Sequence, residues 1–138
     1  MLIAAGDNVF TSSVADFVAY AKNTEVTVAV YDVGDADAIK KYGNVVVDAE
    51  GIITRFEEKP QKPHGTLAAI ALYYYSPAIL SLLTTYLAAG NNPDQPGRFV
   101  QWLYARKPVK TFQIKGQWLD IGSEETLENA DRVLASTR

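Results

Sequence analysis

The sequence predicts an α/β fold in which a mixed sheet is flanked by helices. The first observation is the order of the elements, which is strand, helix, strand, helix, hairpin, strand, helix, helix, strand, helix. The second is that two strand-like runs are separated only by a short turn, which is typical of a β-hairpin. A chain that alternates strands and helices in this way and also contains a hairpin is expected to form one mixed sheet.

The composition is that of an ordinary globular protein. The 138 residues are enough for one domain with a core, and 48% of them are hydrophobic and 21% charged. A formal net charge of −3, without a basic stripe, argues against nucleic acid as the partner. The absence of cysteine excludes disulfides and thiolate metal sites. No apolar run approaches membrane-spanning length and no signal-peptide pattern opens the chain, so we expect a cytoplasmic protein without membrane contacts.

The first quarter of the chain contains a strand, a turn and a helix. Residues 2–5 are apolar without polar alternation, which is typical of a strand buried on both faces, and they follow Met1 directly. Gly6-Asp7-Asn8 has the composition of a turn. Ser12 and Ser13 are suited to cap a helix that runs to about Lys22 with one apolar face.

The middle of the chain contains the hairpin. A β-branched strand is expected at residues 25–31 and a short helix at 35–41. Strands at 45–47 and 52–56 enclose the turn 48–51 and form the predicted hairpin. A loop containing two prolines follows, at residues 59–65.

The last half begins with an apolar and aromatic strand at residues 67–75. Ser76 and Pro77 predict the start of a helix at 78–89, which Gly90 ends. Further elements are expected at 98–106 (helix), 109–114 (strand), 118–122 (extended) and, after the cap Ser123, a final helix with Glu124 and Glu125 in its first turn.

The end of the hairpin carries charges that could bind a ligand. Alternate side chains of a strand share a face, so Phe56 and Glu58 are expected on one face and Arg55 and Glu57 on the other. Pro60 ends the strand and favours an extended backbone at Lys59. A carboxylate can accept hydrogen bonds from sugar hydroxyls, and an ammonium group can pair with a phosphate. A solvated, charged strand end explains the same residues, and is the better interpretation from these residues alone.

Asp7 and Asp120 each lie near a predicted strand end. Ligands of open α/β sheets gather at the carboxyl ends of strands, and two carboxylates there could hold a magnesium ion together with water and phosphate oxygens. The alternatives are a simple turn for Asp7 and a helix-entry position for Asp120. Tyr73 shares a strand face with Tyr75, and its hydroxyl could reach a phosphate or a sugar, although most strand tyrosines are core residues.

Five segments, taken in order, resemble the sugar-phosphate nucleotidyltransferase family, close to the glucose-1-phosphate thymidylyltransferases. The resemblance covers nearly the whole chain. It implies a partial Rossmann-like nucleotidyltransferase fold. The segments are Gly6-Asp7-Asn8-Val9-Phe10, Tyr42-Gly43-Asn44-Val45-Val46, Phe56-Glu57-Glu58-Lys59-Pro60, Leu72-Tyr73-Tyr74-Tyr75 and Trp118-Leu119-Asp120-Ile121-Gly122.

The resemblance implies a reaction and a set of residue roles. Enzymes of this family join a sugar 1-phosphate to a nucleoside triphosphate and release pyrophosphate. Asp7 and Asp120 are the implied catalytic carboxylates and ligands of Mg²⁺. The implied substrate-binding residues are Gly43, which offers backbone contacts to the sugar, Glu58, which accepts sugar hydroxyls, Lys59, which pairs with the sugar phosphate, and Tyr73, which lies near that phosphate.

The sequence departs from the family at its beginning. The family opens with a glycine-rich loop, Gly-x-Gly-Thr-Arg-Leu in character, followed by an essential lysine, and neither occurs here. We therefore expect residues 1–138 to form a single domain that corresponds to the carboxyl-terminal, sugar-phosphate-binding part of a nucleotidyltransferase, inactive by itself and assembled as a homo-oligomer. The alternatives are a non-catalytic sugar-phosphate-binding or interaction module and a subunit completed by another chain.

Overall fold

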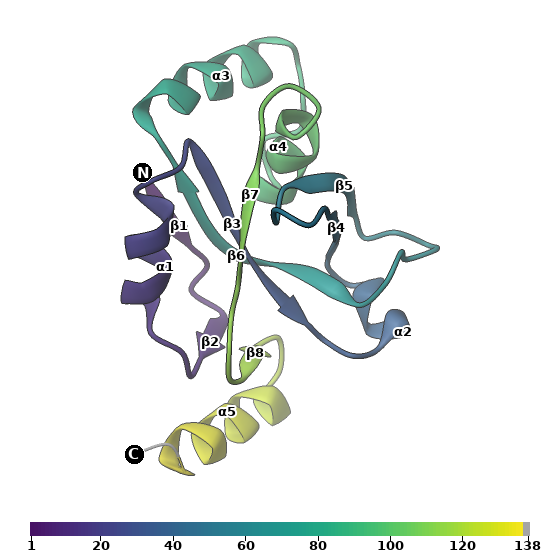
Figure 1. Cartoon of the computed structure of the whole chain (residues 1–138). Coiled ribbons are helices and arrows are strands. Elements are labelled where there is room, and N and C mark those ends of the chain that lie inside the picture. The colour runs from purple at the N-terminus through teal and green to yellow at the C-terminus, as the bar shows by residue number, and fades with distance from the viewer. Residues whose placement is uncertain (137–138) are drawn as a thin grey trace.

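The computed structural model describes residues 1–136, which form a mixed sheet with helices on both faces (Figure 1). The predicted α/β class is confirmed. In chain order the elements are β1 (Leu2–Ala4), β2 (Asn8–Phe10), α1 (Val14–Ala21), β3 (Val26–Asp32), α2 (Ala36–Ile39), β4 (Gly43–Val47), β5 (Ile53–Glu58), β6 (Leu67–Tyr75), α3 (Pro77–Ala88), α4 (Pro96–Leu103), β7 (Lys110–Gln113), β8 (Trp118–Asp120) and α5 (Glu124–Ser136).

The main sheet has the strand order β5-β4-β6-β3-β7, and β1 also pairs with β6. Strands β3 and β7 are parallel, whereas the other named pairs are antiparallel. An antiparallel bridge between Ile52 and Lys110 links β7 back to the start of β5, and the Ile53 N–H donates to the Val109 carbonyl at 2.9 Å. The two ends of the strand order therefore meet along part of their length.

Strand β6 has two partners on the side opposite β3. Strand β4 pairs with its first half, with Gly43 opposite Ala69, and β1 pairs with its second half, with Ala4 opposite Leu72. The Ala5 N–H donates to the Ala71 carbonyl at 2.9 Å just before β1 and β6 separate. The partner strands thus change near the middle of β6, and a change of this kind leaves a crevice in the sheet.

The core lies in two clusters, one on each face of the sheet, as expected from strand alternation. Val26, Val28 and Val30 of β3 belong to the cluster beneath α3 and α4, whereas Ala29 belongs to the cluster beneath α1. Tyr73 and Tyr75 share the first face, with ring centroids 6.3 Å apart, and Tyr74 packs on the second. The three layers are therefore helices α3 and α4, the sheet, and helix α1.

The predicted caps of α1 and α5 are confirmed, whereas that of α3 forms no capping hydrogen bond. The Ser13 side chain accepts a hydrogen bond from the Ala15 N–H at the start of α1, and Ser123 accepts one from Thr126 before α5. Ser76 occupies the N-cap of α3, but its hydroxyl is buried and makes no capping bond. Pro77, at the first turn, has no N–H to leave unsatisfied there.

Two predictions for the first ten residues were wrong. Strand β1 is not buried on both faces: Leu2 is 46% exposed, and the strand runs antiparallel to β6 with no second neighbour among residues 1–136. Asn8, assigned to a turn, instead begins strand β2, which pairs with β8 in a separate two-stranded sheet. An apolar run reports hydrophobicity, whereas the number of neighbouring strands depends on distant parts of the chain.

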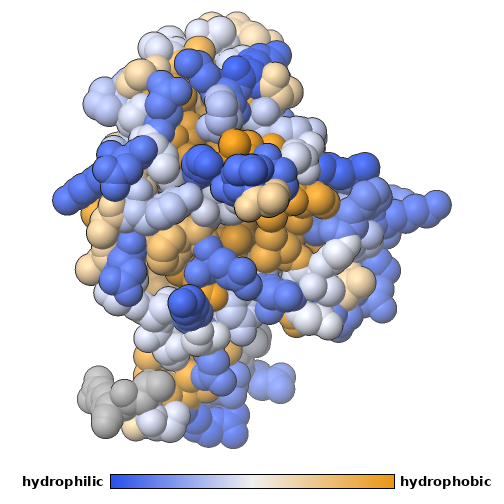
Figure 2. Space-filling model, viewed as in Figure 1, coloured by the Kyte–Doolittle hydropathy of each residue, from blue (hydrophilic) through white to orange (hydrophobic). Residues whose placement is uncertain are grey.

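Helix α5 extends from the body of the molecule (Figure 1). Ala130 is its one buried residue within the described part of the chain, whereas Leu127 is 48% exposed. Figure 2 shows apolar residues across the middle of the molecule and along part of α5 at its lower end. No helix within residues 1–136 is both long and apolar enough to cross a membrane.

Candidate functional site

A cavity of about 310 Å³ lies at the point where β6 changes partners. Ala5, Ala69 and Ala71 line its floor, so the small side chains around the separation of β1 and β4 leave the space open. Five of the six predicted site residues also line this cavity. They are Asp7, Gly43, Glu58, Tyr73 and Asp120.

The small β2–β8 sheet brings the two aspartates together across more than one hundred residues of sequence. Asn8 pairs with Asp120 in the β ladder, and the Ile121 N–H donates to the Asp7 carbonyl at 2.8 Å. Burial raises the pKa of Asp120, and the negative charge of Asp7 raises it further, against the opposing effects of Tyr42 and Lys41. The two carboxylates are therefore close enough to repel each other.

Aromatic and amide side chains support this carboxylate pair. The Asn8 amide donates to Asp7 Oδ1 at 2.7 Å, and its oxygen accepts the Trp118 indole N–H at 2.6 Å. The Tyr42 ring lies 4.9 Å from the Trp118 ring, and burial, followed by the charge of Asp120, raises the Tyr42 pKa. Sequence reasoning did not include Trp118, Tyr42 or Asn8 among the site residues.

The β4–β5 hairpin places Gly43 directly opposite Glu58. The predicted alternation is confirmed, since Phe56 is buried while Arg55 and Glu57 form an exposed ion pair at 3.2 Å. The Glu58 carboxylate is partly buried and accepts no hydrogen bond from the described residues. Burial raises its pKa, and the cations Lys59 and Arg98 act in the opposite direction. A carboxylate without a hydrogen-bond partner in the protein retains its full capacity to accept hydrogen bonds from the hydroxyls of a ligand.

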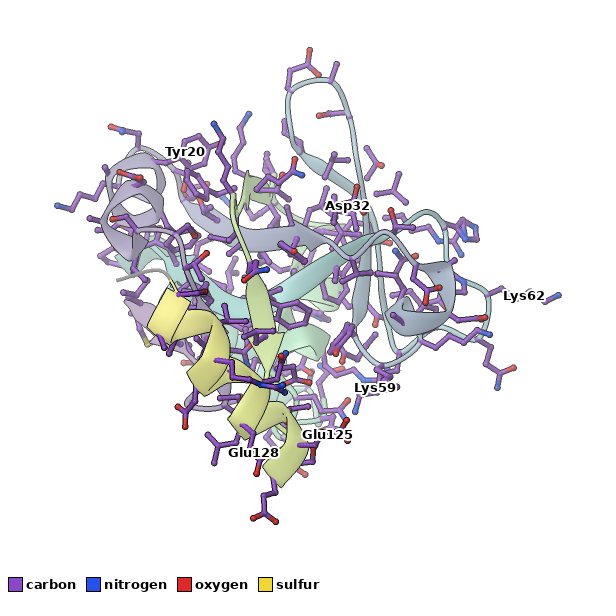
Figure 3. The ribbon with its side chains drawn as sticks, turned by 90° about the horizontal axis from the view of Figure 1, so that it is seen from below. Tyr20, Asp32, Lys59, Lys62, Glu125 and Glu128 are labelled. Atoms are coloured by element: carbon purple, nitrogen blue, oxygen red, sulfur yellow. The ribbon has the colours of Figure 1, made fainter. Side chains whose placement is uncertain are left out.

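Lys59 differs from its prediction in backbone conformation. Its φ is 49°, in the left-handed region, although a residue before proline was expected to be extended. Its N–H donates to the Tyr42 carbonyl at 3.0 Å, so the bond that ends the hairpin holds the strained conformation. The side chain is exposed and does not line the cavity. Figure 3 shows Lys62 extending outward, whereas Lys59 lies nearer the body of the molecule.

Tyr73 lies under the cavity with only 5% of its surface exposed. Its hydroxyl has no hydrogen-bond partner among residues 1–136, and both burial and the nearby Glu58 charge raise its pKa. The hydroxyl is therefore a neutral donor at physiological pH, available to a bound oxygen atom.

The start of helix α4 forms a wall that sequence reasoning missed. Asp94, Gln95, Pro96 and Gly97 all line the cavity. The helix was expected from residue 98, although Pro96 is a good first-turn residue and would have indicated the earlier start.

The two aspartates suit a magnesium ion chemically. They provide hard oxygen ligands at the edge of an open cavity, and their mutual repulsion would be relieved by a cation. Residues 1–136 contain no group of three or more acidic or histidine side chains arranged to hold a metal. A magnesium ion here would take the rest of its ligands from water and substrate phosphates.

Comparison with known proteins agrees with the resemblance to sugar-phosphate nucleotidyltransferases seen in the sequence. The family model of the nucleotidyl transferases matches residues 1–137, so the chain belongs to the nucleotidyl transferase family.

Two similar proteins are both glucose-1-phosphate adenylyltransferases. The chain is 30% identical over 142 residues to the glucose-1-phosphate adenylyltransferase of Thermomicrobium roseum, covering 97% of this chain and 32% of that protein. It is 29% identical to the glucose-1-phosphate adenylyltransferase of Bacillus subtilis, covering 95% of this chain and 36% of the relative. The chain thus spans about a third of the length of these relatives.

A solved structure shares the fold. It is a Bacillus anthracis protein described as a glucose-1-phosphate thymidylyltransferase, in complex with a sucrose. The TM-score is 0.81 at 21% sequence identity, and the match covers 96% of this chain and 53% of the other.

Proposed function

We propose that this chain forms the sugar-phosphate and magnesium half of a sugar-1-phosphate nucleotidyltransferase. One observation carries the proposal: a single cavity collects Asp7 and Asp120 with Gly43, Glu58 and Tyr73. The family membership and the names of the relatives support the same substrate class. The complete reaction would give a nucleotide sugar and pyrophosphate.

Each residue has a role that follows from its surroundings. Glu58, whose carboxylate accepts no hydrogen bond from the described residues, accepts hydrogen bonds from sugar hydroxyls, and the backbone of Gly43, directly opposite it, contacts the sugar. Tyr73 donates its hydroxyl proton to a substrate oxygen. Lys59, exposed beside Glu58, provides the positive charge for the sugar phosphate.

In the reaction an oxygen of the sugar phosphate attacks the α-phosphorus of the nucleotide. The bond between that phosphorus and the oxygen bridging to the β-phosphate breaks, and pyrophosphate leaves with the bonding electrons. Asp7 and Asp120 would hold Mg²⁺, whose charge would offset that of the phosphates. The protein contributes mainly by orienting the sugar phosphate, because position and charge neutralisation supply most of the acceleration in such transfers.

Calorimetric titration tests the binding part of the proposal. Glucose 1-phosphate should bind in the presence of Mg²⁺, whereas glucose or inorganic phosphate alone should bind far more weakly. Asp7→Asn and Asp120→Asn should reduce the effect of Mg²⁺ on binding. Asp131→Asn, an exposed change in α5 outside the cavity, is the matched control. Equal affinity for glucose 1-phosphate and free phosphate would contradict the proposal.

A further inference from the structure

The Glu58 carboxylate lies between two glycines from different elements. A Cβ atom added to Gly43 in β4 would lie 3.2 Å from Glu58 Oε2 and 2.7 Å from Phe56 Cζ. A Cβ atom added to Gly97 in α4 would overlap Glu58 Oε2 and lie 3.1 Å from Glu58 Cδ. The carboxylate therefore occupies a slot that exists because both neighbours lack a side chain.

Helix α4 contacts Glu58 at a second point. The Gln101 Oε1 atom accepts the Glu58 backbone N–H at 3.3 Å. Gly97 and Gln101 are four residues apart, so they share one face of the helix. One face of α4 thus touches both the backbone and the carboxylate of Glu58, and Arg98 on the same helix adds a positive charge nearby.

The slot can fix the orientation of the Glu58 carboxylate. A glutamate side chain has three rotatable bonds, and no described donor fixes this carboxylate by hydrogen bonding. Its orientation must therefore come from the surrounding surfaces. Glycine is a poor helix former, so its presence in the first turn of α4 suits a position where a side chain has no room.

We propose that helix α4 positions the sugar-binding carboxylate and that Gly97 is its decisive positioning residue, an inference that rests on the proposed role of Glu58 in sugar binding. The atom that a new side chain would displace is the far end of a flexible side chain rather than backbone. Gly97→Ala should consequently turn the carboxylate away from the cavity while the fold persists.

A double-mutant cycle in the full chain separates positioning from a general structural role. Gly97→Ala should weaken glucose 1-phosphate binding by roughly tenfold to a hundredfold. Glu58→Asp should weaken binding by itself, but its shorter side chain no longer reaches the added methyl group. Gly97→Ala should therefore cause little further loss in the Glu58→Asp background. Losses of equal size in the two backgrounds, or no loss in the native background, would overturn the proposal.

A measurement without ligand keeps this inference distinct from the proposed function. NMR titration of the Glu58 side-chain carboxyl carbon should show a pKa above the ordinary value in the native chain, because the effect of burial exceeds the opposing effect of the cations Lys59 and Arg98. Gly97→Ala should lower that pKa by moving the carboxylate into solvent. If glucose 1-phosphate does not bind the native chain, the proposed function fails, and the titration still tests the slot. An unchanged Glu58 titration in Gly97→Ala would refute the positioning role.

One further variant and a test of folding complete the design. Gly122→Ala is the matched control, since no atom lies within 4 Å of its added Cβ and its φ is not positive, and it should leave both the affinity and the Glu58 titration unchanged. If Gly97→Ala does not fold, Glu58→Asp in the same chain should restore folding by removing the overlap. A double variant that remains unfolded would show that the conflict lies elsewhere.

Discussion

The Glu58 carboxylate is partly buried, which disfavours its charged form, and it has no hydrogen-bond partner among the described residues. Burial raises its pKa above the usual 4.5, so the folded state favours the protonated form. The stabilising contribution of that proton is fully present below 4.5 and is lost as the pH rises through the raised folded pKa. At neutral pH the ionised carboxylate therefore destabilises the fold, a cost that fits the binding role proposed for Glu58.

Glu58→Gln should thus make the chain more stable at neutral pH, because the amide does not ionise and has nearly the same shape. The stability difference should disappear below pH 4.5, where the native side chain is protonated in both states. Denaturant unfolding at a series of pH values measures this difference. The same variant should lose affinity for glucose 1-phosphate. A lower stability at neutral pH would contradict the account of Glu58.

Lys59 provides a second test at the residue scale, because its charge and its backbone have separate effects. Lys59→Ala and Lys59→Gly both remove the charge and should weaken glucose 1-phosphate binding equally, by about 1 kcal/mol for an exposed contact. Glycine also relieves the left-handed backbone, so Lys59→Gly should be more stable than Lys59→Ala by roughly 1 kcal/mol. Thermal unfolding of the pair measures the second effect. Equal stability would show that the φ of 49° is not strained.

At the scale of elements, Asn44 joins the hairpin to the loop that follows it. Its side chain is 4% exposed, donates to the carbonyls of His64 and Leu67, and accepts the His64 N–H at 2.6 Å. The side chain of His64 is exposed, but its backbone is held by this hydrogen bond. The loop between β5 and β6 is therefore anchored at its end by one buried amide.

Asn44→Ala should destabilise the chain by roughly 2 to 3 kcal/mol, because it leaves three backbone groups without their partner. Urea unfolding measures the loss. Thr54→Ala in the same hairpin is a suitable control, since its hydroxyl makes one exposed bond to the Val46 carbonyl, and it should change stability by less than about 1 kcal/mol. A comparable effect of the two changes would mean that Asn44 does not anchor the loop.

The elements that the sequence predicted correctly are those with local signals. The hairpin, α1 and α5 each have a turn or cap within a few residues, and their positions were close to those observed. Strand β2 has no such signal: it is three residues long, and its partner β8 lies more than one hundred residues away. The early start of α4 was missed by two residues, and these include Gly97.

The site was predictable to a similar degree. The resemblance supplied six residues, and five of them line one cavity. The supporting contacts of Asn8, Tyr42, Trp118 and Gly97 depend on how β8 and α4 pack against distant strands. The backbone of Lys59 was mispredicted for the same reason, because a tertiary hydrogen bond to Tyr42 outweighs the local preference of a residue before proline.

At the scale of the whole molecule, one edge of β1 has no partner among residues 1–136, and Met1 and Leu2 are 45% and 46% exposed. Such an edge can pair with the same edge of a second copy around a two-fold axis. We expect the chain to dimerise in this way. Leu2→Lys should shift light-scattering masses toward the monomer, whereas Leu87→Lys, also at a leucine 46% exposed, should not. A native chain that stays monomeric at high concentration would contradict the expectation.

The last prediction concerns catalysis by the 138-residue chain alone. Holding two substrates in line contributes about 7–11 kcal/mol to such reactions, and this contribution requires that both be bound together. The proposed site has groups for the sugar phosphate, but the 138 residues contain no Gly-x-Gly-Thr-Arg-Leu loop for a triphosphate. Without a metal ion, Asp7 and Asp120 would also repel phosphates, as the effect of the Asp7 charge on the pKa of Asp120 already indicates.

The chain should therefore bind glucose 1-phosphate and yet release no pyrophosphate with any nucleoside triphosphate. A coupled pyrophosphate assay with Mg²⁺ measures this, and calorimetry on the same preparation confirms that the sugar phosphate is bound. Asp7→Asn is the control for contaminating host enzyme, since a contaminant would be unaffected by it. Turnover that Asp7→Asn abolishes would show that the residues around this cavity are sufficient for catalysis, and that the nucleotide binds to groups other than a glycine-rich loop.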